Sequence, residues 1–113
     1  MNCYILDENN TPILQDNPMD AWKWGTAHNR RVAYTKLPNG VRVSTIFLVL
    51  DHSFEAGGPP VLWETMIFGG RYDQAQDRYT SHEAALVGHA AMVKLAQEPD
   101  EREKDEADYR STL

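Results

Sequence analysis

The dipeptide Asn39-Gly40 lies between two runs that alternate apolar and polar residues, RRVAYTKL at 30–37 and VRVSTIFLVL at 41–50. Asparagine followed by glycine accepts the positive φ angles of a tight turn, so this pair predicts a β-hairpin. A third run, VLWETMIF at 61–68, alternates in the same way but is largely apolar on both faces, which is typical of a central strand. The three runs predict a three-stranded antiparallel meander.

The N-terminal part of the chain predicts a small hairpin followed by a short helix. The runs CYIL and TPIL flank the turn-forming DENN, so residues 3–14 predict a β-hairpin. Pro18 suits the first turn of a helix, and Asp16 or Asn17 suits the capping position before it. A helix is therefore expected over residues 18–27.

The segment RYTSHEAALVGHAAMVKLAQ predicts the main helix of the protein. Thr80 and Glu83 form the pattern of a capping box. One apolar arc at helical spacing is expected to pack on a face of the sheet; it consists of Ala85, Gly88, Met92, Leu95 and Ala96. We therefore predict an α+β fold with one domain over residues 1–96, followed by an acidic C-terminal helix or tail over residues 97–113.

Charge and composition exclude several classes of function. Residues 97–113 carry seven acidic and three basic side chains, which is more than half of the net charge of −6. Direct nucleic-acid binding is not expected, because such affinity comes mainly from Lys and Arg on phosphates. The longest apolar run, at 46–50, is too short to span a membrane, and Cys3 is the single cysteine. We expect a cytoplasmic protein that does not associate with membranes.

Two groups of side chains are candidates for binding a partner. Trp22 and Tyr79 are aromatic and flank polar, turn-like segments, whereas most other aromatic residues are expected in the core. The acidic C-terminal segment suits a protein or nucleoprotein complex with a basic surface. Its candidate residues are Glu101, Glu103, Asp105 and Glu106. A homodimer is compatible with the same features.

A second hypothesis is a small metal-dependent enzyme or a metal-binding protein. Two imidazoles and two carboxylates are available as ligands or general bases; they belong to Asp51, His52, Glu64 and His89. Their spacing matches no local ligand motif, so such a site requires His52 and His89 to converge in the fold. Otherwise Asp51 is a turn residue, Glu64 lies on a sheet face, and His89 bonds to a backbone group.

The loop EAGGPP at 55–60 is not a phosphate-binding loop. It lacks the lysine and the Ser or Thr that open a helix in such loops, and its two prolines have no backbone N–H to donate. No cofactor is expected. A third hypothesis is an oligomeric protein that sequesters a ligand in a pocket at subunit interfaces around the whole loop DHSFEAGGPP at 51–60.

Four segments together resemble a family of small proteins encoded in bacteriophages and prophages: YILDENNTPI, VSTIFLVLDH, GGPPVLWETMIFGG and RYTSHEAALVGHAAMV. The resemblance covers roughly residues 4–95 and carries no catalytic residue. It implies a phage setting, in which small acidic proteins without catalytic motifs often bind and block a host machine. The resulting expectation is a phage accessory protein that inhibits a host defence complex, as an anti-CRISPR protein does, in the bacterial cytoplasm.

Overall fold

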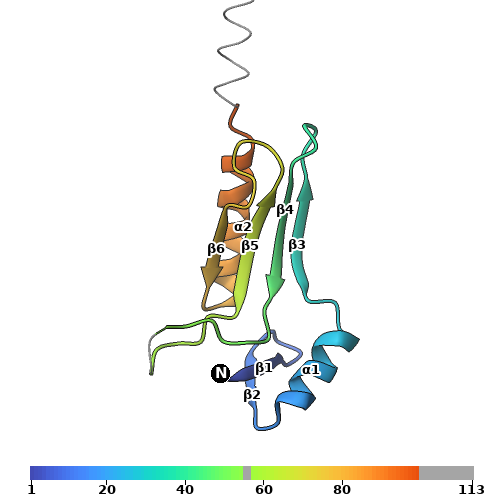
Figure 1. Ribbon diagram of the computed structural model, residues 1–113, viewed down its shortest axis with the longest axis vertical. Helices are drawn as coiled ribbons and strands as arrows, with labels where there is room; N and C mark the ends of the chain where they lie inside the picture. The colour runs from blue at the N-terminus through green and yellow to red at the C-terminus, as the bar shows by residue number, and fades with distance from the viewer. Residues whose placement is uncertain (55–56, 100–113) are drawn as a thin grey trace, which may run out of the picture.

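The fold is α+β, as the alternation of apolar residues predicts, and it contains two antiparallel sheets and two helices (Figure 1). A computed structural model describes residues 1–54 and 57–99. The elements in chain order are β1 (Cys3–Leu6), β2 (Pro12–Gln15), α1 (Pro18–Ala27), β3 (Arg31–Lys36), β4 (Arg42–Phe47), β5 (Trp63–Phe68), β6 (Gln76–Tyr79) and α2 (His82–Ala96). None of the helices in the described residues is long and apolar enough to cross a membrane.

The predicted N-terminal hairpin and short helix are both confirmed. β1 and β2 pair antiparallel, and the Asp7 carboxylate closes their turn by accepting hydrogen bonds from backbone N–H groups. α1 begins at Pro18, and the Asn17 side chain caps it by accepting a hydrogen bond of 3.0 Å from the N–H of Met19. Local signals of turn and cap chemistry determine this region.

The larger sheet has the strand order β3-β4-β5-β6, with every neighbouring pair antiparallel. The hairpin at Asn39-Gly40 is confirmed, and Gly40 has a φ of 86°. β5 is an inner strand, as its apolar faces predict. The predicted number of three strands is wrong, because β6 adds a fourth. Its sequence QDRY carries one apolar side chain, Tyr79, so it has no clear strand pattern.

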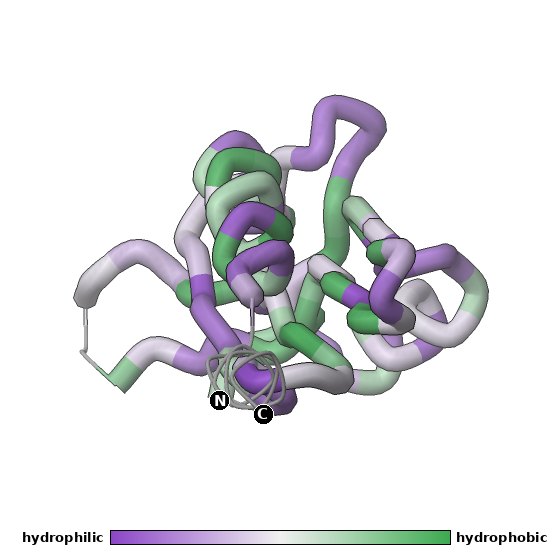
Figure 2. Tube along the Cα trace, turned by 90° about the horizontal axis from the view of Figure 1, so that it is seen from above, coloured by the Kyte–Doolittle hydropathy of each residue, from purple (hydrophilic) through white to green (hydrophobic). Residues whose placement is uncertain are grey.

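α2 packs along one face of this sheet and lies behind it in Figure 1; Figure 2 gives the view from above. The helix begins one residue later than the predicted capping box implies. Ser81, not Thr80, is the cap, and its hydroxyl accepts a hydrogen bond of 3.0 Å from the N–H of Ala84. The residues that α2 buries recur at helical spacing: they are Ala85, His89, Met92 and Ala96.

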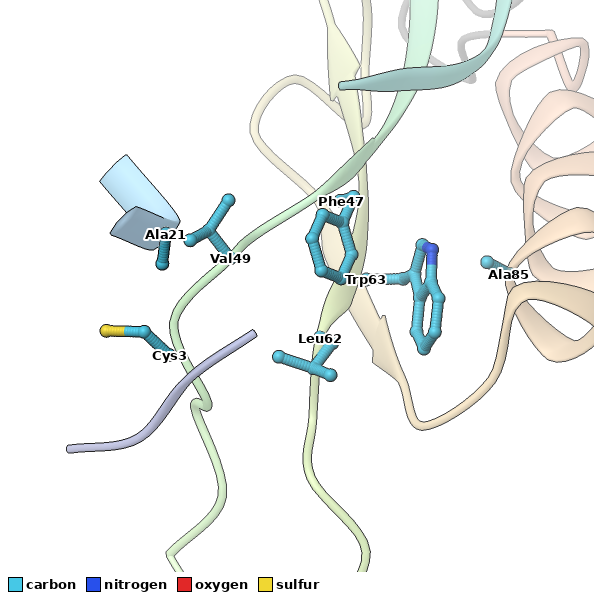
Figure 3. Packing of buried hydrophobic residues seen from close by; sticks show 7 residues of the cluster. All are labelled: Cys3, Ala21, Phe47, Val49, Leu62, Trp63 and Ala85. Carbon is cyan, nitrogen blue, oxygen red and sulfur yellow. The ribbon is translucent and has the colours of Figure 1, made fainter. Parts of the chain in front are cut away.

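The face of the sheet that α2 covers holds two apolar clusters. The lower one joins the sheet to the N-terminal hairpin and α1 (Figure 3) and consists of Cys3, Ala21, Phe47, Val49, Leu62, Trp63 and Ala85. The upper one consists of Leu37, Val41, Val43, Ile67, Met92 and Ala96. Three buried polar side chains lie between this face and α2: Thr45 and Thr65 on the sheet and His89 on the helix. The domain is thus built around two clusters rather than one continuous apolar layer.

Candidate functional site

The four candidate metal ligands do not converge. Glu64 lies on the sheet face away from α2, where Arg78 donates a hydrogen bond of 2.8 Å from Nε to its carboxylate. His89 lies on α2 and contacts the opposite face. No group of three or more His, Cys, Asp or Glu side chains in residues 1–54 and 57–99 is placed to hold a metal ion. The convergence that the metal hypothesis requires is therefore not found.

Asp51 and His52 are bonded within their own loop. Asp51 Oδ1 accepts hydrogen bonds from the N–H of Ser53 at 2.8 Å and of Val61 at 2.9 Å, so it closes the base of the β4–β5 connection. Burial alone would raise the pKa of Asp51, but these backbone hydrogen bonds outweigh it and hold the pKa below its ordinary value. His52 Nδ1 donates to the carbonyl of Leu50 at 2.8 Å. Both residues organise the loop.

His89 belongs to a buried polar row that crosses three strands. Its Nδ1 is 2.7 Å from the hydroxyl of Thr45, and its Nε2 is 2.9 Å from the hydroxyl of Thr35. Thr45 also bonds to the hydroxyl of Thr65 on the next strand. The three threonines come from β3, β4 and β5, so the imidazole connects α2 to most of the sheet. The predicted bond to a backbone group is replaced by bonds to side chains.

The environment of His89 suits a structural role. Only 8% of the residue is exposed, and burial lowers its pKa. A neutral imidazole has one donor and one acceptor nitrogen, which satisfies one threonine hydroxyl on each side. A substrate has little access to a group enclosed in this way. The His89 row therefore holds α2 in register on the sheet.

Tyr79, predicted as a partner-binding residue, lies between the sheet and α2. It is half-buried against the lower apolar cluster. A Cβ atom added at Gly88 of α2 would overlap the Tyr79 ring, so the helix backbone lies directly against the ring. Burial raises the pKa of the Tyr79 hydroxyl. Tyr79 is therefore a packing residue and not a projecting side chain.

Trp22, the other aromatic candidate, does project from the molecule. Its exposed fraction is 66%, and it lies on α1 at the rim of an apolar groove of about 410 Å³. We call this feature the α1 groove. It lies between α1 and the segment that follows β4, and its main apolar lining residues are Cys3, Met19, Ala21, Trp22, Val49 and Leu50. Trp22, Met19 and Leu50 are exposed large apolar side chains at one site.

Backbone strain marks the floor of the α1 groove. Val49 has a φ of 69°, a conformation that β-branched residues rarely adopt. Two contacts hold it there: its carbonyl accepts a hydrogen bond of 2.8 Å from the N–H of Tyr4, and α1 approaches so closely that a Cβ at Gly25 would lie 3.3 Å from its Cγ2. Strain of this kind clusters at binding and active sites, where the surrounding structure maintains it.

Sequence reasoning identified Trp22 but missed Met19, Val49 and Leu50. The signal for the last two is that the apolar run at 46–50 continues beyond the end of β4, so its last side chains face α1 instead of the sheet. The candidates Glu101, Glu103, Asp105 and Glu106 lie outside the described residues. The predicted acidic helix or tail falls mostly in the same part of the chain.

Comparison of the chain with models of protein families, with curated proteins and with solved structures finds no match. The resemblance to phage proteins therefore stays an expectation. The α1 groove combines the predicted residue Trp22, an apolar cavity and the strained backbone of Val49. These features make it the candidate binding site of the described residues.

Proposed function

We propose that the protein is a phage-encoded accessory protein that binds a host protein or nucleoprotein complex and inhibits a host defence complex. The observation that carries the binding proposal is Trp22, which projects at the rim of the apolar α1 groove. Tryptophan is enriched at the centres of protein interfaces, where it supplies a large apolar area and an N–H donor. Trp22 inserts into the partner, and the groove receives an apolar side chain in return.

The acidic C-terminal segment supports the choice of a basic partner. Its seven carboxylates in residues 97–113 favour encounter with a positively charged surface, and the effect is a faster association more than a stronger contact. Defence complexes that hold nucleic acid carry such surfaces, because their Lys and Arg side chains neutralise phosphates. The aromatic anchor and the acidic segment thus have separate tasks, the first in affinity and the second in steering.

Quantitative affinity capture from host lysate tests the binding proposal. Wild type, Trp22→Ala and Val87→Ala serve as baits; Val87 is a matched control because it is an exposed apolar residue on α2. We expect wild type and Val87→Ala to recover one partner in equal amounts. Its recovery should fall by at least about tenfold with Trp22→Ala. Equal recovery of every protein by all three baits would contradict the proposal.

Neutralisation of the acidic segment tests the steering role. In the variant Glu101→Gln, Glu103→Gln, Asp105→Asn, Glu106→Gln, the association rate with the captured partner should fall and lose most of its salt dependence. The dissociation rate should change little. An unchanged association rate at low ionic strength would remove the acidic segment from the proposal.

Phage plating tests inhibition of host defence. The protein is expressed in bacteria that carry an active defence system, and plating of a sensitive phage is compared with that in cells expressing Trp22→Ala. We expect wild type to restore plating and Trp22→Ala to fail. Capture of a partner without any effect on a defence system that contains it would keep the binding proposal and reject the inhibition.

The α1 groove also supports a second candidate, the sequestration of a small apolar ligand, because its volume lies in the range of ligand pockets. This candidate differs from the pocket expected at subunit interfaces around residues 51–60. Native mass spectrometry of the purified protein separates the two roles. An added mass that Trp22→Ala no longer retains indicates a ligand, and a ligand-free chain favours a protein partner.

A further inference from the structure

In residues 1–54 and 57–99 no helix packs on the sheet face away from α2, and the charge of this face is opposite to that of the whole chain. We call it the open sheet face and define it by the side chains that alternate with those under α2. It faces the viewer in Figure 1, and α2 is the one described helix that packs along the sheet, on the other side. Four cations lie on this face against one carboxylate, in a chain whose formal charge is −6: Arg31, Lys36, Arg42 and Arg78 against Glu64.

The strand register places these cations at the two ends of the face. Lys36 and Arg42 are register partners at the end near the Asn39-Gly40 turn. Arg31 lies at the other end, opposite Ile46. One row of side chains on this face lies between the two ends, which are four residues apart along β4, from Arg42 to Ile46, or roughly 13 Å. Arg78 also lies at the lower end but forms an ion pair with Glu64 at 2.8 Å.

The central row of the face combines two large side chains with two smaller or polar ones and is only partly covered. It consists of Tyr34, Ser44, Met66 and Gln76, and Phe68 lies in the end row beside Arg42. Tyr34 is 42% exposed and Phe68 36% exposed. Large apolar side chains between two charged ends suit a docking surface, in which an anchor is surrounded by a polar rim.

Three of the four cations, Arg31, Lys36 and Arg42, have no compensating charge among the described residues. No carboxylate in that part of the chain lies within ion-pair distance of Lys36, Arg42 or Arg31. Like charges directly opposite each other on a sheet are destabilising. Protection of an edge strand explains Lys36 and Arg31 on β3, since lysine and arginine discourage pairing with another sheet. It does not explain Arg42, which lies on the inner strand β4.

Two of the guanidinium groups are already positioned by aromatic rings. Arg31 Cζ lies 4.3 Å from the centroid of the Tyr34 ring, and Arg42 Cζ lies 5.6 Å from the centroid of the Phe68 ring. A guanidinium held over a ring keeps its N–H edges free for a carboxylate. Because the side chain is already ordered, it loses less conformational entropy on binding. The same arrangement covers ring faces on which a nucleobase would have to stack.

We propose that the open sheet face binds an acidic segment of a partner protein, in which two carboxylates roughly 13 Å apart flank an apolar side chain. The carboxylates bind Arg42 with Lys36 at one end and Arg31 at the other, and the apolar side chain lies on Tyr34 and Met66. Single-stranded nucleic acid fits less well, because its bases would have to stack on ring faces that Arg31 and Arg42 already cover. This surface is separate from the α1 groove and does not depend on the partner proposed there.

A selection from a displayed library of random peptides tests the proposal without assuming a sequence. Wild-type protein is the target, and Lys36→Glu/Arg42→Glu is used for counter-selection. We expect the enriched peptides to carry paired acidic residues around an apolar residue. An enriched set without an excess of Asp and Glu, or no enrichment at all, would overturn the proposal.

The affinity of one enriched peptide then locates its site. Lys36→Glu/Arg42→Glu should weaken binding by at least about tenfold, whereas the control Lys23→Glu/Lys94→Glu makes the same change of charge on exposed positions of α1 and α2 and should change it less than about twofold. Thermal unfolding of both double variants verifies that they fold. Equal weakening by both would show only a general charge effect and reject the site.

Two further measurements exclude other occupants. A short oligothymidine should bind more weakly than the peptide; tighter binding that Lys36→Glu/Arg42→Glu abolishes would replace the acidic segment by nucleic acid. Sedimentation of wild type at increasing concentration should show no association that depends on Lys36 and Arg42. Association that the double variant abolishes would replace the partner by a second copy of the chain.

Discussion

The two faces of the larger sheet carry different kinds of side chain on alternate residues of the same strands. On β5, Trp63, Thr65 and Ile67 are buried under α2, while Glu64, Met66 and Phe68 lie on the open sheet face. The covered face holds the two apolar clusters and the His89 row, and it determines the stability of the fold. The open sheet face carries Arg31, Lys36 and Arg42, which have no ion-pair partner among the described residues, so it is the face on which selection for binding can act.

The largest contrast between the faces is expected from two changes in one strand. Trp63→Ala removes the largest fully buried side chain of the lower cluster and should lower the free energy of unfolding by about 3–5 kcal/mol. Met66→Ala, on the half-buried open face, should lower it by about 1 kcal/mol. Urea unfolding measures both values. Equal losses would mean that the open face is part of the core; if Trp63→Ala does not fold, Trp63→Leu gives the comparison.

A smaller loss of stability is expected where α2 lies against β6, and a double-mutant cycle can identify its cause. Gly88→Ala should destabilise the protein by about 1–3 kcal/mol, because its Cβ overlaps the Tyr79 ring, although alanine is the better helix former. Tyr79→Ala removes the ring and also costs stability. In the double variant the Gly88→Ala penalty should disappear, which a double-mutant cycle measures. Additive losses would contradict the contact.

Structural features that depend on neighbouring residues in the sequence were predictable, and contacts between residues far apart in the sequence were not. Asn39-Gly40 and Pro18 determine a turn and a helix start within a few residues, and both are confirmed. His89 bonds to Thr45 and Thr35, which are 44 and 54 residues away, so no local pattern reveals it. The polar strand β6 forms because Leu62 and β5 offer it an edge, and its own sequence does not predict it.

The candidate surfaces were only partly predictable for a related reason. The hairpin register makes Lys36 and Arg42 neighbours, which the sequence allows one to deduce. Lys36 and Arg42 remain exposed because α2 covers the other face of the sheet. The choice of face depends on the packing of the whole domain, which the sequence does not show. Trp22 was predictable from its polar surroundings, whereas Tyr79 was not, because its contact with Gly88 depends on the position of α2.

Acidification should lower the free energy of unfolding through His89, which is buried between α2 and the sheet. Burial holds the pKa of His89 below its value of 6.5 in an unfolded chain, so the unfolded state takes up the proton first as the pH falls. The free energy of unfolding should therefore be fully retained above about pH 6.5 and decrease as the pH falls below it. Urea unfolding at several pH values measures this slope. His89→Gln should flatten it, because the buried imidazole that causes the slope is then absent.

The smallest expected effect is that of Lys36→Glu on the open sheet face, which should raise stability and weaken binding. Lys36→Glu converts a pair of like charges opposite Arg42 into a pair of opposite charges, so it should raise the free energy of unfolding by about 0.2–1 kcal/mol at low salt. The gain should vanish in an Arg42→Ala background, and Lys94→Glu on α2 should not reproduce it. The same substitution should weaken binding of an acidic peptide. A variant that is more stable but binds less well means that Lys36 is retained for binding at a cost in stability, whereas a loss of both properties would assign the cation to the fold.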